Sequence, residues 1–196
     1  MRSLVIVLGD QLDRQSAAFD GFDPKQDAVW MAEVAEESTH VWTHKARIAV
    51  FLAAMRHFRK RLESEGISVD YRTLATSPLA DEPVSLAEAL TASLASLEKA
   101  KQLAQRLVVV EPGEWRVRQA IERVARTGNL HLDIRTDRHF FTTADEFAEH
   151  ARGRKQLRLE YFYRPLRAKF GVLMDGDEPA GGQWNFDAEN RGAFPK

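Results

Sequence analysis

The fold of this chain is decided by the stretch Ser3-Leu-Val-Ile-Val-Leu-Gly-Asp-Gln-Leu12. The five apolar residues before Gly9 do not alternate with polar ones, which is typical of a strand buried on both faces of a parallel sheet. Gly9 ends this run, and Asp10 and Gln11 follow it with polar side chains. Ligands of open α/β sheets bind at the carboxyl ends of the strands. We therefore expect this turn to form the floor of a pocket.

Similar apolar runs recur along the chain, and amphipathic segments separate them. Strands are predicted at residues 4–8, 27–33, 67–74, 106–111 and 130–136. Helices are predicted at 43–65, from Ser85 onward, and at 114–126. Alternating strands and helices indicate βαβ units with right-handed crossovers. The fold class predicted for residues 1–142 is therefore α/β, with a five-stranded doubly wound parallel sheet.

The helix predicted at 43–65 has one apolar face. Its members recur at intervals of three and four residues and are Ile48, Phe51, Leu52, Met55, Phe58 and Leu62. Thr43 is the expected N-cap, and Gly66 stands where a glycine often follows a helix. The segment from Glu33 to Glu37, just before this helix, is expected to be a loop.

The pattern changes after residue 142. We predict a helical appendage at 143–170 and an extended interdomain linker at 171–196, which is rich in glycine and has no periodicity. Residues 152–169 contain seven basic residues and one acidic residue, Glu160. This stretch, with its tyrosines, either follows a nucleic-acid backbone or is a solvated helix face whose tyrosines pack on the sheet or on another domain. We favour the second interpretation.

Composition excludes several classes of protein. The chain has 196 residues and a formal net charge of −1, whereas a whole-chain nucleic-acid binder is usually strongly basic. It contains no cysteine, which removes disulfides, thiolate catalysis and iron–sulfur ligation by this chain. No apolar run approaches the roughly 20 residues of a membrane span, and the first residues do not resemble a signal peptide. We expect a cytoplasmic protein.

Polar residues follow the predicted strands. They are Asp10, Gln11, Glu33, Glu36, Glu37 and Glu111. If the sheet brings them to one crevice, they would accept hydrogen bonds from ring N–H groups and hydroxyls of a heterocyclic or polyol ligand, and they would repel phosphate. Alternatively, the acids only stabilise the N-termini of the helices that follow. The residues alone leave both interpretations open.

The sequence contains no motif for phosphate binding, metal binding or nucleophilic catalysis. No glycine-rich phosphate loop follows the first strand. His40 and His44 are four residues apart, but no third ligand stands nearby, so we predict no metal site. No histidine accompanies a serine or cysteine nucleophile signature, and we predict no catalytic residue.

Several longer motifs resemble a known family. They are Leu8-Gly-Asp-Gln-Leu12, Trp30-Met-Ala-Glu-Val34, His44-Lys-Ala-Arg-Ile-Ala49 with Ala54-Met-Arg-His-Phe58, Glu111-Pro-Gly-Glu-Trp-Arg-Val117, Tyr161-Phe-Tyr-Arg164, Leu173-Met-Asp-Gly176 and Gly181-Gly-Gln-Trp-Asn-Phe-Asp-Ala-Glu-Asn-Arg191. From Leu4 to Arg191, the chain resembles the amino-terminal part of photolyase-related proteins. The similarity is to the branch of bacterial (6-4) photolyases and iron–sulfur cryptochromes.

The resemblance implies a Rossmann-like antenna domain that can hold 6,7-dimethyl-8-ribityllumazine at the carboxyl edge of the sheet. The positions that match its pocket are Gly9, Asp10, Gln11, Glu33, Val34, Glu37, His44, Ile48, Phe51 and Glu111. Phe51 would turn a bulky ring toward the chromophore. The implied role is non-radiative energy transfer to a flavin outside this chain.

Family members continue into a helical domain that binds FAD and carries four cysteines for an iron–sulfur cluster. This chain stops at Lys196 and has no cysteine, so we expect it to be a fragment or a truncated relative of a (6-4) photolyase-like DNA repair enzyme. Alone, it would bind no FAD or cluster and have no catalytic activity. The implied partners are the FAD-binding helical domain and DNA, the latter through residues 152–169. The alternatives are a chromophore-free docking module and a small nucleotide-binding α/β protein.

Overall fold

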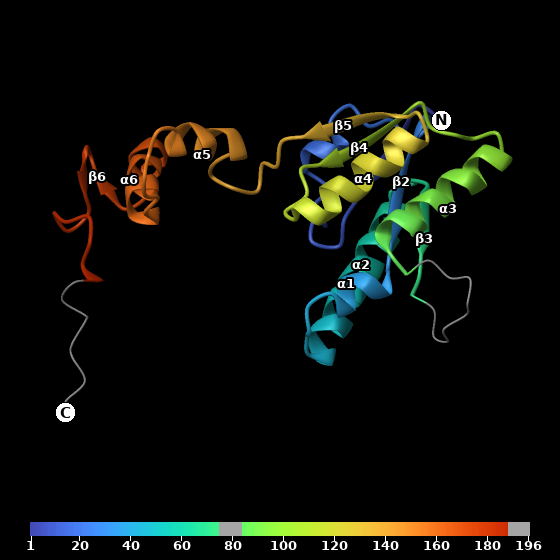
Figure 1. Ribbon diagram of the computed structural model, residues 1–196, viewed down its shortest axis with the longest axis horizontal. Coiled ribbons are helices and arrows are strands. Elements are labelled where there is room, and N and C mark those ends of the chain that lie inside the picture. The colour runs from blue at the N-terminus through green and yellow to red at the C-terminus, as the bar shows by residue number, and fades with distance from the viewer. Residues whose placement is uncertain (75–83, 188–196) are drawn as a thin grey trace. The chain divides into compact units, whose positions relative to one another are not determined.

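The computed structural model describes residues 1–74 and 84–187 of the chain (Figure 1). They belong to two compact units, Met1–His139 and Phe140–Lys196. Residues 75–83, between the strand predicted at 67–74 and the helix predicted from Ser85, lie outside the described residues, as does the predicted linker beyond residue 187. None of the helices in the described part of the chain combines the length and apolar character that a bilayer span needs.

The first unit is built on a five-stranded sheet in which all strands are parallel. The strands are β1 (Ser3–Ile6), β2 (Asp27–Ala32), β3 (Val69–Arg72), β4 (Arg106–Val110) and β5 (His131–Arg135), in the order β3-β2-β1-β4-β5. Ser3 of β1 lies opposite Asp27 on one side and Arg106 on the other. The doubly wound α/β prediction is therefore confirmed, with strands slightly shorter than expected.

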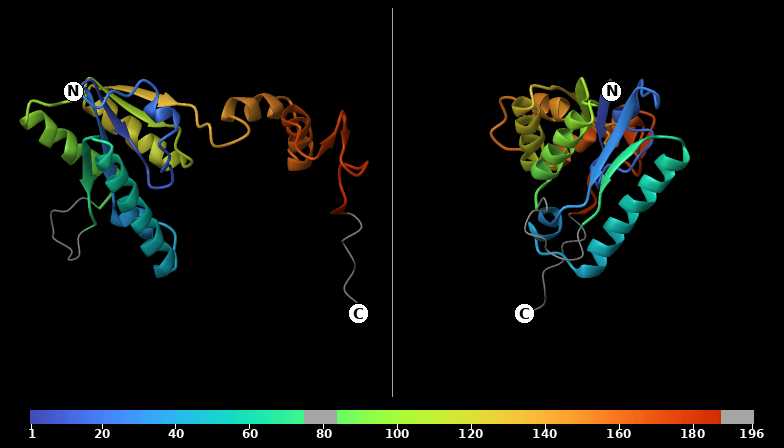
Figure 2. Two further views of the ribbon diagram at one scale, coloured as in Figure 1. Left: turned by 180° about the vertical axis from the view of Figure 1, so that it is seen from behind. Right: turned by 90° about the vertical axis from the view of Figure 1, so that its right-hand side faces the viewer.

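Helices cover both faces of this sheet. They are α2 (Lys45–Ser64), α3 (Leu86–Lys99) and α4 (Trp115–Thr127), with the 3₁₀ turn η1 (Ala17–Phe19). Successive strand residues face opposite layers, because side chains alternate along a strand. Leu4 and Trp30 pack with α3 and α4, whereas Val5 and Met31 pack with α2 and η1. Figure 2 shows α2 on one side of the sheet and α3 and α4 on the other.

Two predictions about the segment before α2 were wrong. A short helix, α1 (Ala35–Thr39), replaces the loop expected up to Glu37. It has only five residues and buries none of them, so it leaves no apolar periodicity in the sequence. The N-cap of α2 is His44, whose Nδ1 accepts a hydrogen bond from the amide of Ala46 at 3.2 Å. The hydroxyl of Thr43, the expected cap, instead donates to a backbone carbonyl.

The second unit contains two helices and a small hairpin. The elements are α5 (Ala144–Ala151), α6 (Leu159–Phe170), β6 (Met174–Asp175) and β7 (Glu178–Pro179). Phe147 of α5 meets Phe162 of α6 edge to face, with ring centroids 5.1 Å apart. The start of the segment expected to be an extended linker therefore folds back on itself, because β6 and β7 pair as antiparallel strands.

Most basic residues of the stretch 152–169 have partners inside this unit. Lys169 pairs with Glu146 at 2.6 Å, and the guanidinium groups of Arg164 and Arg167 lie over the ring of Trp184. Arg152, Arg154 and Arg158 also have local partners. The contact with DNA stays a prediction.

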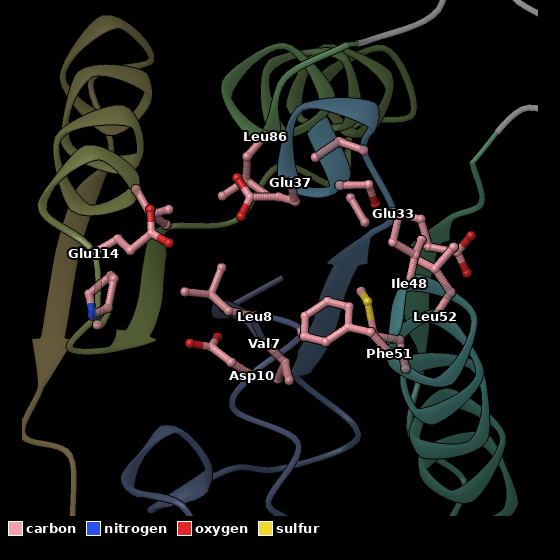
Figure 3. Close-up of a pocket in the computed structure, with 18 of the residues that line it drawn as sticks. Val7, Leu8, Asp10, Glu33, Glu37, Ile48, Phe51, Leu52, Leu86 and Glu114 are labelled. Carbon is pink, nitrogen blue, oxygen red and sulfur yellow. The ribbon is translucent and has the colours of Figure 1, made fainter. Parts of the chain in front are cut away.

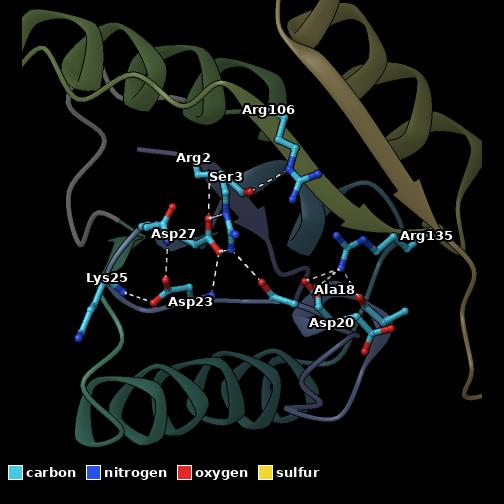
Figure 4. A network of polar contacts seen from close by, with 12 residues as sticks. Arg2, Ser3, Ala18, Asp20, Asp23, Lys25, Asp27, Arg106 and Arg135 are labelled. Atoms are coloured by element: carbon cyan, nitrogen blue, oxygen red, sulfur yellow. Dashed lines mark hydrogen bonds and ion pairs between the residues drawn. The ribbon is translucent and has the colours of Figure 1, made fainter.

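A buried carboxylate joins the amino ends of β1 and β2 (Figure 4). The Asp27 side chain is 2% exposed and accepts hydrogen bonds from the Arg2 guanidinium and from the backbone amides of Ser3 and Asp23. Burial by itself raises the pKa of the Asp27 carboxyl, but these donors outweigh it and hold the pKa below its usual value. Asp27 therefore stabilises the fold as an anion.

We expect Asp27→Asn to lower the free energy of unfolding by about 2 kcal/mol, because hydrogen bonds to a charged group contribute roughly 1.5–3 kcal/mol. The folded-state pKa is depressed, so this stabilisation is present above about pH 4 and is lost as the pH falls through the folded pKa. Urea unfolding across this pH range measures both effects. Asp177→Asn, at an exposed site, is the control. An equal loss in both variants would contradict the prediction.

Candidate functional site

A cavity of about 280 Å³ opens at the carboxyl edge of the sheet (Figure 3). Its walls come from the segments after β1, β2 and β4, from α1 and α2, and from the first turns of α3 and α4. The chain runs outward from β1 to β3 and then returns to the other side of β1, so this is the point where the strand order reverses. The volume lies just below the roughly 300–1,000 Å³ of typical small-molecule sites.

The N-terminal half of α2 forms an apolar wall of the cavity. Met55, Phe58 and Leu62 of the predicted stripe are buried in the core, whereas Ile48 and Phe51 are not. These two line the cavity, and Figure 3 shows the Phe51 ring projecting into it from α2. One amphipathic face therefore serves both the core and the cavity.

Gly9 lets this wall approach the end of β1. A Cβ atom at Gly9 would lie 2.5 Å from ring atoms of Phe51 and 2.9 Å from the sulfur of Met55. No side chain fits there without displacing α2 residues. Gly9, the glycine predicted to end the first strand, thus also leaves the space that the Phe51 ring occupies.

Seven of the ten residues predicted to bind a ligand line the cavity: Gly9, Asp10, Glu33, Val34, Glu37, Ile48 and Phe51. The other three have different contacts. The Gln11 amide donates to the backbone carbonyl of Glu111 at 3.1 Å, the Glu111 carboxylate pairs with Arg118 at 2.7 Å, and His44 caps α2. Of the six polar residues predicted to follow the strands, the cavity lining contains three: Asp10, Glu33 and Glu37. Ligand contact stays a prediction for each of the ten.

The Glu33 carboxylate has no acceptor position to spare. It is 0% exposed, and its Oε1 accepts from Arg56 Nε at 2.6 Å and from the Tyr71 hydroxyl at 2.5 Å. Its Oε2 accepts from Arg56 Nη2 at 2.8 Å and from the amide of Leu74 at 3.0 Å. A carboxylate offers about four lone-pair positions, and protein donors fill all of them. Glu33 thus clamps α2 to β3 behind the cavity wall.

The protonation states at this clamp follow from its contacts. Burial alone raises the pKa of the Glu33 carboxyl, but hydrogen bonds from Arg56, Tyr71 and Leu74 outweigh it and keep the pKa below its usual value. Burial, reinforced by the hydrogen bond to Glu33, raises the pKa of Tyr71 strongly. Glu33 is therefore an anion and Tyr71 a neutral phenol near neutral pH.

The carboxylates at the cavity rim have different surroundings. One guanidinium, that of Arg116, lies within ion-pair distance of Glu36, Glu37 and Glu114, at 3.3, 2.9 and 3.1 Å. Asp10 lies on the opposite segment, after β1, and no donor in the described residues contacts its carboxylate. Together these groups make the rim acidic and leave acceptor oxygens toward the cavity.

Sequence reasoning missed several residues of this site. Arg116 and Glu114 belong to the motif Glu111-Pro-Gly-Glu-Trp-Arg-Val117, but they stand at the start of α4 and not directly after a strand, so the pattern of polar residues at strand ends does not indicate them. Arg47, which also lines the cavity, stands on the polar side of the predicted helix pattern. Across residues 1–74 and 84–187, no group of three or more metal-ligating side chains occurs.

Comparisons with known proteins point the same way as the motifs. The family described as deoxyribodipyrimidine photo-lyase-related protein matches residues 5–196. A (6-4) photolyase of Agrobacterium fabrum is 44% identical over 191 residues, which are 97% of this chain and 36% of that relative. An uncharacterized protein of Acanthamoeba polyphaga mimivirus is 20% identical over 206 residues, which cover 96% of its length. The chain thus spans about a third of the photolyase.

The contacts of the buried Glu33 carboxylate lead to a prediction about stability. We expect Glu33→Gln to lower the free energy of unfolding by about 3 kcal/mol, because it replaces two acceptor positions by an amide facing donors, and breaking a buried pair costs roughly 3–5 kcal/mol. Glu63→Gln is the control, since Glu63 is exposed and its pair with Arg59 spans 3.6 Å. Chemical denaturation of both variants measures the difference. Equal stability of the two would show that the clamp contributes nothing.

Proposed function

Since this chain belongs to the deoxyribodipyrimidine photo-lyase-related proteins, we propose that its cavity binds an antenna chromophore of the lumazine type. The observation that carries the proposal is the position and lining of the cavity. It lies at the switch point of the sheet and combines an apolar wall with acceptor oxygens at the rim. In the whole protein, the bound chromophore would pass excitation energy to a flavin held outside this chain.

The lining suits a flat, uncharged ring with a polyol chain. Leu8, Ile48 and Phe51 offer apolar surface to a ring face. Asp10 and Glu37 offer oxygens that accept hydrogen bonds from ring N–H groups and hydroxyls. These side chains bind and orient the chromophore, and none of them takes part in a bond-forming step.

The same lining disfavours a phosphorylated ligand. Asp10, Glu37 and Glu114 place three carboxylates around the opening, whereas the lining contains one arginine, Arg47, and the nearby Arg116 pairs with Glu37 and Glu114. A phosphate needs backbone N–H groups or unpaired cations. This charge distribution argues against the alternative of a nucleotide-binding protein.

One observation favours a second function, a docking module without a chromophore. The Phe51 ring projects into a cavity of only about 280 Å³ and leans on Gly9. If this ring excludes a chromophore, the wild-type chain will not bind lumazine and Phe51→Leu will. The affinity of the wild-type chain for lumazine therefore distinguishes the two functions.

We expect 6,7-dimethyl-8-ribityllumazine to bind the purified chain with a saturable, red-shifted absorption band. Glu37→Gln should weaken this binding about tenfold, because one hydrogen bond to a charged acceptor contributes roughly 1.5 kcal/mol. Glu98→Gln, on the exposed side of α3, is the control and should bind like the wild type. Absorption and fluorescence titrations measure the affinities. Absence of binding in the wild-type chain would refute the proposed function.

A further inference from the structure

The short helix α1 carries Glu37 but is weakly held by packing. None of its residues, Ala35–Thr39, is buried. Its contacts with the rest of the first unit include a hydrogen bond from the amide of Glu36 to the carbonyl of Val84 at 3.0 Å. Glu36 and Glu37 also make ion pairs with Arg116. A helix without a buried face needs such polar contacts to keep its position.

Arg116 belongs to α4, a helix that is packed against the sheet. It is the second residue of α4, and Val117, Ala120 and Ile121 of this helix are buried against the sheet. Its guanidinium is a rigid fork that can hold more than one carboxylate at once. Nη1 faces Glu36, while Nη2 donates to Glu37 and to Glu114. The side chain thus links α1, which carries Glu36 and Glu37, to the core through α4.

The two oxygens of Glu37 are not equivalent in this arrangement. Oε1 accepts from Arg116 Nη2 at 2.9 Å, and no donor among the described residues contacts Oε2. Figure 3 shows the Glu37 side chain reaching from α1 across the opening toward Glu114. With Arg116 absent, Glu36, Glu37 and Glu114 would lose the cation that they share, and their mutual repulsion would disfavour the present position of α1.

We propose that Arg116 is a positioning residue of the ligand site, which holds α1 in place and fixes Glu37 so that its second oxygen faces a ligand N–H or hydroxyl. This inference rests on the proposed function, because it assigns Arg116 a part in the same site. It differs from a role in general stability. Arg118 provides the contrast, since it is on the same helix and binds Glu111 and Glu122, neither of which lines the cavity.

The test is a double-mutant cycle in the full chain, with 6,7-dimethyl-8-ribityllumazine as the probe. Arg116→Gln should weaken binding about tenfold in the wild-type background and by less than about twofold in the Glu37→Gln background. Arg116→Lys, which keeps the charge, should restore part of the loss, and Arg118→Gln should bind like the wild type. An equal loss from Arg116→Gln in both backgrounds would overturn the inference, because the residue would then act without Glu37.

A second measurement does not depend on the chromophore. Hydrogen exchange of the amides in residues 35–40 should become faster in Arg116→Gln and remain unchanged in Arg118→Gln, because Arg116 pairs with residues of α1 and Arg118 does not. Unchanged exchange in Arg116→Gln would overturn the inference whatever the titration shows. If the wild-type chain binds no lumazine but exchange responds as expected, the proposed function fails while the link between Arg116 and α1 stands.

Discussion

The position of β1 between β2 and β4 is the constraint on which the rest of the structure depends. Because β1 is hydrogen-bonded to β2 on one side and buried on both faces, the chain after β3 must pass β2 and β1, through α3, to add β4 on the free side of β1. The segments after β1, β2 and β4 then end at one edge of the sheet, and the cavity lies between them. The helices that make the crossovers supply its remaining walls. An apolar strand with a glycine at its end therefore places a binding site as well as a core.

The carboxylates at this edge of the sheet differ in how many protein donors contact them and therefore in their roles. Glu33 is saturated by Arg56, Tyr71 and a backbone amide, so it holds a wall in place. Among the residues that the structure describes, one oxygen of Glu37 has no donor while the other accepts from Arg116, and neither oxygen of Asp10 has a donor. Desolvation makes a buried charge costly unless donors surround it, so the most buried of these carboxylates is also the most completely paired.

The helix α2 links the core to the site. Its C-terminal half packs Met55, Phe58 and Leu62 under the sheet, and its N-terminal half presents Ile48 and Phe51 to the cavity. Arg56, near the middle of the helix, pairs with Glu33. Stability of the clamp and shape of the cavity are therefore coupled through one helix.

The amino-acid sequence by itself determined the order of the strands along the chain, the three main helices of the first unit and the polar residues after the strands. Hydrophobic periodicity and glycine positions are local properties, so they can be read without a structure. The family could also be recognised from motifs such as Leu8-Gly-Asp-Gln-Leu12.

Only the tertiary structure decided which acids are paired, because their arginine partners lie far away in the chain, Arg56 for Glu33 and Arg116 for Glu37. It likewise decided that Gln11, His44 and Glu111 lie outside the cavity lining and that α1 exists. Long-range pairing and burial depend on how separate elements pack, and the local pattern of a sequence carries no record of that packing.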